Sequence, residues 1–254
     1  MRRIILPAAV VVMLLVSCEG ERRASAPSFS ARSNISAAAT AEASDTGSPS
    51  VAPSPSPEPT TLPAGVPASF SEDVPAGELP VDQLIPPGDE LTGVRRARTD
   101  AGEAVVLMFA TPGSDPFAQA RGFVVWRRDE RAEPPWRAVY GLAHRARDGV
   151  LAVSADTTDL TGDGSDDALV RAETGGTGAC ATYRVIDLAA GAPIWKRSVC
   201  DAEVQPNPDP IGLYVVARVY EPGDPHCCPS AISERVFTWN GDRFVVVSQD
   251  VTPL

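Results

Sequence analysis

The chain has 254 residues, with 33 acidic and 22 basic side chains and a formal net charge of −11 at pH 7. A surface this acidic repels polyanions, which excludes nucleic acid as a partner. Only two histidines occur, so centres built on several imidazoles are excluded as well.

The N-terminus has the pattern of a secretory signal. Arg2 and Arg3 precede an apolar stretch over residues 4–16. This stretch is shorter than the about 20 residues that a membrane-spanning helix needs, and polar residues follow it. We therefore expect residues 1–17 to be a cleaved signal peptide.

The residues at the expected cleavage point are Leu15-Val16-Ser17-Cys18. They resemble the lipobox of bacterial lipoproteins, which implies cleavage before Cys18 and lipidation of its thiol. At about 0.8 kcal/mol per buried methylene, two or three acyl chains form a stable membrane anchor. The resemblance thus implies a lipid-anchored protein on the extracellular face of the cell membrane; the alternative is an ordinary secretory signal.

Residues 18–67 are rich in Ala, Ser, Thr and Pro and contain few large apolar side chains. Such a composition cannot bury enough apolar surface to offset chain entropy. We expect a disordered linker, extended at about 3.1 Å per residue in its proline-rich parts.

Residues 68–254 contain ten short runs rich in Val, Ile, Tyr, Trp and Phe, which is the composition of β-strands. The runs are 104–110, 122–127, 137–142, 150–154, 168–172, 182–187, 194–199, 212–220, 232–239 and 243–248. Turn residues separate them, most clearly at 240–242, and only residues 80–85 could hold a helical turn. The prediction is an extracellular all-β domain of about ten strands, arranged as a sandwich or as a propeller-like stack of meanders.

An acidic, glycine-containing loop spans residues 159–167, between two predicted strands. Oxygens at alternate positions of such a loop can converge on calcium. The candidate ligands are Asp159, Thr161, Asp163, Ser165 and Asp167. An EF-hand is excluded because Val170 occupies its twelfth position, where a bidentate glutamate is required.

This loop resembles the FG-GAP or VCBS repeat, whose pattern is Asp-x-Asx-x-Asp-Gly-x-x-Asp. Thr161 replaces the usual Asp or Asn, and the loop occurs once, whereas a propeller would repeat it. The resemblance implies calcium as a cofactor that stiffens the loop. In the alternative, the carboxylates form Asx-turns with backbone N–H groups and bind no metal.

Four cysteines remain besides Cys18, and an even number outside the membrane predicts disulfides. Cys180 and Cys200 flank a predicted hairpin centred on residue 190, which would place them opposite each other. That pairing leaves Cys227 and Cys228 for a vicinal bond. In the alternative, Cys227 and Cys228 each bridge to one of the other two.

The segment 224–230, with its Cys-Cys-Pro-Ser sequence, resembles actinobacterial secreted lipoproteins of the LppP and LprE kind. These are envelope proteins without an assigned reaction, so the resemblance implies no catalytic residue. His226 beside Cys227 and Cys228 is a conceivable metal site, but oxidised cysteines cannot ligate a metal.

Two function classes follow. The first is a non-catalytic binding or structural module whose partner is an envelope protein, a glycan or a small ligand. The second is a secreted hydrolase with acidic catalytic residues, which need no sequence signature. No Gly-x-Ser-x-Gly or His-Glu-x-x-His motif occurs, so we expect the protein not to be an enzyme.

Overall fold

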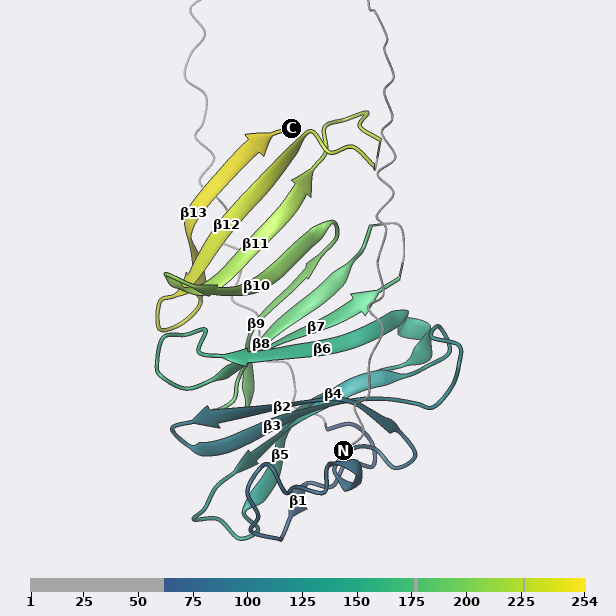
Figure 1. Cartoon of the computed structure of the whole chain (residues 1–254), viewed down its shortest axis with the longest axis vertical. Helices are drawn as coiled ribbons and strands as arrows, with labels where there is room; N and C mark the ends of the chain where they lie inside the picture. Colours follow the sequence, from purple (N-terminus) through teal and green to yellow (C-terminus); the bar gives the residue numbers. More distant parts are fainter. Residues whose placement is uncertain (1–61, 176–177, 226) are drawn as a thin grey trace, which may run out of the picture. The chain divides into compact units, whose positions relative to one another are not determined.

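The computed structural model describes residues 62–254 except 176–177 and 226 (Figure 1). The predicted signal peptide, Cys18, most of the predicted linker and His226 lie outside the described residues. Within them, 13 strands form three antiparallel sheets, which confirms the all-β prediction. No helix in this part of the chain has the length and apolar composition needed to cross a bilayer.

The strands follow one another along the chain, with two 3₁₀ helices between them. The elements are β1 (Ser69–Phe70), η1 (Val81–Gln83), β2 (Glu90–Thr99), β3 (Gly102–Ala110), β4 (Arg121–Arg128), β5 (Trp136–His144), η2 (Ala146–Asp148), β6 (Val150–Thr158), β7 (Asp167–Thr174), β8 (Ala181–Asp187), β9 (Ala192–Val199), β10 (Ala202–Pro208), β11 (Ile211–Val219), β12 (Ala231–Trp239) and β13 (Phe244–Pro253).

The three sheets are consecutive meanders that stack face to face in chain order (Figure 1). The first sheet has the strand order β1-β5-β4-β3-β2, the second β6-β7-β8-β9 and the third β10-β11-β12-β13. Each contains four successive strands paired antiparallel with their neighbours in the chain. This is the predicted stack of short meanders.

Strand β3 shows how the first sheet comes to be buried on both faces. Ala104, Val106 and Met108 pack toward the second sheet. Val105 and Leu107, pointing the opposite way, pack against the segment before β2. Because both faces are covered, the strand is apolar throughout instead of alternating.

Two tryptophans attach the N-terminal segment to the outer face of the first sheet. The indole N–H of Trp126 donates to the Leu84 carbonyl at 3.1 Å, and that of Trp136 donates to the Val74 carbonyl at 2.9 Å. Leu62 also packs on this face, although it precedes the predicted start of the domain at residue 68. Packing therefore begins inside the predicted linker.

A separate aromatic cluster joins the second sheet to the third. Trp195 on β9 makes edge contacts with Phe237 and Phe244, at centroid distances of 6.5 and 6.2 Å. Leu213 and Val185 are fully buried beside them. This cluster closes one end of the space between the two sheets.

Each of the ten predicted runs coincides with a strand, eight of them entirely, while 212–220 and 243–248 extend one residue beyond β11 and β13; η1 lies within residues 80–85. The turn at Asn240 is also as predicted, since its side-chain oxygen accepts the N–H groups of Asp242 and Arg243 between β12 and β13. The strands β1, β2 and β10 are additional to the prediction.

Candidate functional site

The acidic loop between β6 and β7 is held by its own carboxylates. Both oxygens of Asp159 accept backbone hydrogen bonds, from Gly162 at 2.6 Å and from Gly164 at 3.0 Å. Asp163 accepts the N–H of Ser165 at 2.8 Å. The Asp163 contact is an Asx-turn, and in all three contacts a short side chain replaces a backbone acceptor.

Asp167 is the buried carboxylate of the loop, with 2% of its surface exposed. One of its oxygens accepts the N–H groups of Leu160 and Thr161, at 3.0 and 3.1 Å. Burial raises the pKa of this carboxyl from 3.8 to about 7, and the negative charges of Asp187 and Asp163 also raise it. The hydrogen bonds from Leu160 and Thr161 lower the pKa, but by less than burial raises it. The carboxyl thus titrates near neutral pH.

The loop also joins the second sheet to the first. The Ser165 hydroxyl accepts the N–H of Asp100 at 3.0 Å. Asp166 accepts the N–H of Arg98 with its carboxylate and donates its own N–H to the Arg98 carbonyl, both at 2.9 Å. These contacts give the loop a structural role between the two sheets.

Four of the five candidate calcium ligands hydrogen-bond to groups of the protein itself. The carboxylates of Asp159, Asp163 and Asp167 face backbone N–H groups, and the Ser165 hydroxyl faces Asp100. Among the described residues, no three acidic, histidine or cysteine side chains are grouped so that they could hold a metal ion. This geometry matches the Asx-turn alternative, and calcium binding stays a prediction.

Cys180 and Cys200 form a disulfide that closes the β8–β9 hairpin, where Ala181 pairs with Val199. This is the first of the two predicted pairings, and the crossed alternative does not occur. Cys227 and Cys228 are exposed thiols with sulfurs 2.9 Å apart. The contact with Cys227 raises the pKa of the Cys228 thiol. The vicinal bond stays a prediction.

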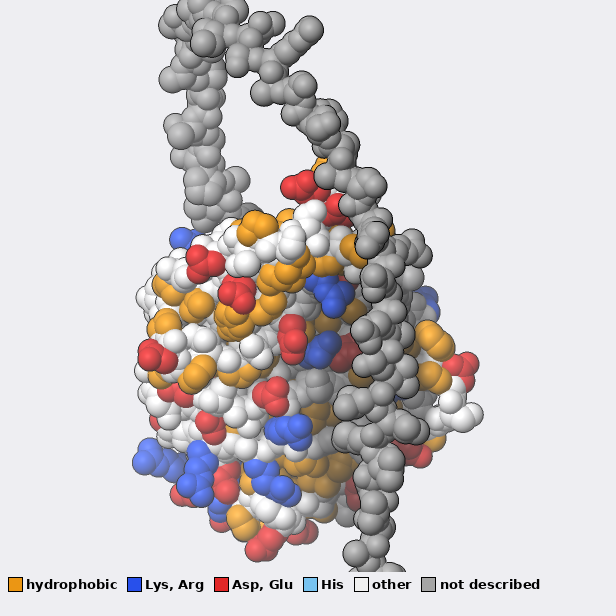
Figure 2. Space-filling view, turned by 45° about the horizontal axis from the view of Figure 1, so that its top comes forward, with side chains coloured by type: hydrophobic (Ala, Val, Ile, Leu, Met, Phe, Trp, Pro, Cys, Tyr) orange, Lys and Arg blue, Asp and Glu red, His pale blue; other side chains and the backbone are white. Residues whose placement is uncertain are grey.

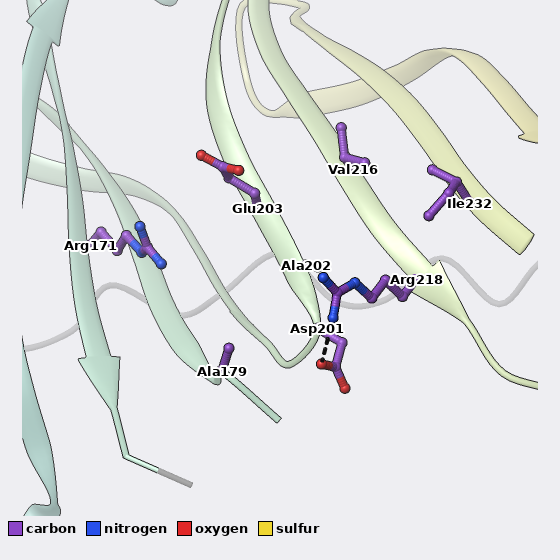
Figure 3. A pocket seen from close by; sticks show the side chains of 8 residues that line it. All are labelled: Arg171, Ala179, Asp201, Ala202, Glu203, Val216, Arg218 and Ile232. Carbon is purple, nitrogen blue, oxygen red and sulfur yellow. Dashed lines mark ion pairs between the residues drawn. The ribbon is translucent and has the colours of Figure 1, made fainter. Parts of the chain in front are cut away.

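Beside the disulfide, a cleft of about 310 Å³ opens between the second and third sheets (Figure 3). Its charged side chains are Arg171 on β7, Glu203 on β10, Arg218 on β11 and Asp201 just before β10. The carboxylate of Asp201 lies 4.0 Å from the Arg218 guanidinium. Figure 3 shows Arg171 and Glu203 extending toward each other from the two sheets.

Backbone strain is concentrated at the same place. Ala179 (φ 40°) and Asp201 (φ 52°) are the non-glycine residues with positive φ in the described part of the chain. Both line the cleft, each next to a cysteine of the disulfide. Left-handed backbone is costly for a residue with a Cβ, and such residues often cluster at functional sites.

The face of the molecule shown in Figure 2 has no extended patch of one charge. In Figure 2, acidic and basic side chains are interspersed over the face shown. Selective recognition therefore depends on local hollows rather than on a broad electrostatic field.

No motif marks this cleft in the sequence, because its walls come from segments far apart in the chain. The usable signal is strand alternation. Arg171 lies two residues after the buried Leu169 on β7, so the two side chains lie on the same face of the second sheet. Leu169 packs against the third sheet, and Arg171 therefore also points toward it. An arginine on an inward-facing position is a sign of a polar hollow.

Comparison with family models, with curated proteins and with solved structures finds no match to this chain.

Proposed function

We propose that the protein is a non-catalytic binding module of the bacterial cell envelope, anchored through lipid on Cys18 and carrying its β-domain on the linker. The lipobox pattern, the apolar stretch before it and the Ala/Ser/Pro-rich composition of residues 18–67 support this proposal. The disulfide is consistent with an oxidising, extracytoplasmic environment.

The cleft beside the disulfide is the binding site in this proposal. The observation that carries it is the coincidence of strained backbone at Ala179 and Asp201 with charged side chains converging from two sheets. Strain of this kind persists only where the surrounding structure holds it, and the disulfide supplies that support. Charges of both signs suit a ligand with donors, acceptors and charge, such as a cell-wall peptide or glycan.

The alternative function is a secreted hydrolase, for which the cleft offers the carboxylates of Asp201 and Glu203. Both come from the same end of β10, not from opposite walls. Asp201 is also already paired with the Arg218 guanidinium, at 4.0 Å. This arrangement favours binding over acid–base chemistry, which needs two carboxyl groups facing each other across the reacting bond.

The anchor is tested with the full chain expressed in an actinobacterial host fed an alkyne-labelled fatty acid. Wild-type protein should fractionate with membranes and carry the label, and the Cys18→Ser variant should carry none and appear in the medium. Equal labelling or equal fractionation of the two proteins would overturn the anchor.

Binding is tested by co-sedimenting the full chain with isolated cell walls of the same host. Glu203→Gln combined with Arg218→Gln should weaken binding about tenfold or more, because each change removes a charged contact in the cleft. The control is Asp242→Asn with Arg243→Gln, which removes one acid and one base from the exposed hairpin between β12 and β13. Equal binding by both double variants, or no binding by wild type, would refute this use of the cleft.

A further inference from the structure

A second hollow, of about 290 Å³, lies between the second and third sheets and shares only Ala202 with the cleft. Its aliphatic wall includes Val199, Val215, Val219 and Val251. Its principal polar groups are the guanidinium groups of Arg197 on β9 and Arg235 on β12. The hollow is therefore an apolar space with two positive charges.

The strand registers explain why these arginines face inward. On the second sheet, Arg197 pairs with Tyr183, which pairs with Arg171, so these three side chains form one row across the face that meets the third sheet. On the third sheet, Arg235 pairs with the buried Val215 and shares its face. The aromatic cluster of Trp195, Phe237 and Phe244 lies next to this row and closes one end of the space between the two sheets.

The two guanidinium groups have no acidic partner among the described residues. Neither forms an ion pair with a carboxylate there, whereas Arg128 and Arg171 both do. Arg197 instead lies over the Phe237 ring, 5.7 Å from its centroid. Burial lowers the pKa of Arg197, and the positive charge of Arg235 lowers it further. The protein thus holds two like charges in a partly desolvated site without neutralising either.

A hydrogen-bond donor at the same hollow also lacks an acceptor. The Nε atom of Arg235 is buried and has no hydrogen-bond partner in the described structure. Buried donors normally find an acceptor, so this one points to an acceptor that the polypeptide does not provide.

We infer that this hollow binds a small organic anion with an apolar body, its carboxylate or phosphate head held between Arg197 and Arg235 and its hydrocarbon part lying against the valines. A planar guanidinium bonds such a head in a forked geometry, and two of them fix its position. The valine wall excludes water from the hydrocarbon part. This site is separate from the cleft proposed above and does not depend on the function of that cleft.

The test uses the full chain and measures octanoate binding by calorimetry, with acetate and octanol as probes of the head and the tail alone. Octanoate should bind at least about tenfold more tightly than either probe, because only octanoate engages both the arginines and the valines. Octanol binding as tightly as octanoate would show a merely apolar groove and overturn the inference. Co-sedimentation of the Cys18→Ser variant, which lacks the proposed lipid anchor, with phosphatidylglycerol vesicles should be negligible because the chain is acidic; vesicle binding by this variant without binding of octanoate would also overturn the inference.

Variants locate the site. Arg197→Gln with Arg235→Gln should lose octanoate affinity by about tenfold or more, whereas Arg147→Gln with Arg243→Gln, which removes two exposed positive charges elsewhere, should bind as wild type does. Equal affinities of the two double variants would refute the site.

A second pair of variants covers the case in which the arginine variant does not fold. Val251 is 54% exposed at the rim of the hollow, so Val251→Glu is compatible with folding and places a competing carboxylate beside the arginines. Val247→Glu is its control, 53% exposed on the same strand but outside the hollow. Only Val251→Glu should abolish octanoate binding, and retention of binding by it would contradict the inference.

Discussion

Replacing Asp167 by asparagine should stabilise the protein at neutral pH, although the carboxylate that it replaces is buried and accepts two hydrogen bonds. The amide oxygen of asparagine can still accept the N–H groups of Leu160 and Thr161, which are 3.0 and 3.1 Å from the carboxylate. What the substitution eliminates is a negative charge in a site that is 2% exposed. An uncharged isostere avoids the desolvation of that charge.

The magnitude follows from the pKa of Asp167, which rises from 3.8 to about 7 on folding. The folded state therefore binds this proton more tightly than the unfolded state, so the free energy of unfolding falls as the pH rises from about 4 to about 7. At about 1.4 kcal/mol per pKa unit, the loss approaches about 4 kcal/mol as an upper limit. Below pH 4 both states are protonated and the penalty is absent.

The assay is urea denaturation of wild type and Asp167→Asn from pH 3.5 to 8.5, in the presence of chelator. The difference in unfolding free energy should be small at pH 3.5 and grow in favour of the variant until about pH 7, then level off. Asp242→Asn, which removes an exposed carboxylate from the hairpin between β12 and β13, is the control and should not reproduce this rise. A difference that is constant with pH, or one that favours wild type at pH 8, would refute the reasoning.

Three further outcomes are expected. Gly212→Ala should cost about 3 kcal/mol, because its Cβ would lie 1.9 Å from the Phe237 carbonyl oxygen, whereas Gly77→Ala, with nothing within 4 Å, should be near neutral in the same denaturation assay. Trp126→Phe should cost about 1 to 3 kcal/mol, because it leaves the Leu84 carbonyl without its indole donor; an unchanged midpoint in urea would contradict this. Calcium at about 1 mM should raise the thermal unfolding midpoint above that in chelator if the loop binds the ion, and an unchanged midpoint would leave its carboxylates with their backbone role alone.

The strands that are buried on both faces are among those that the sequence predicts. β3 and β4 consist of apolar runs because both of their faces are covered. β2 contains three arginines, and β10 contains Pro206 and Pro208, so neither has a strand-like composition. Both are edge strands, where charge and proline are tolerated because one side of the backbone needs no partner.

Whether the sequence predicts a site residue depends on whether its partners lie in the same segment of the chain. The Cys180–Cys200 bridge is local to one hairpin, so the sequence proposes it, but as one of two pairings that spacing leaves open. The loop at 159–167 is recognisable as acidic, but sequence cannot tell whether its oxygens face a metal or backbone N–H groups. Residues such as Arg197 and Arg235 come together only through the stacking of two sheets, which no pattern within one segment encodes.

The chain-order stacking of three meanders also has a consequence for how the protein reaches its native state. Each sheet is closed by neighbours along the chain, and the Cys180–Cys200 bridge spans only 20 positions within the second sheet. Short loop closures cost little entropy, and predominantly local pairing speeds the folding of β-proteins. During synthesis, which begins at the N-terminus, the chain can therefore complete the first sheet before the last strands are available. Each finished sheet then offers an apolar face on which the next one assembles, and the bridge can form without waiting for the C-terminus.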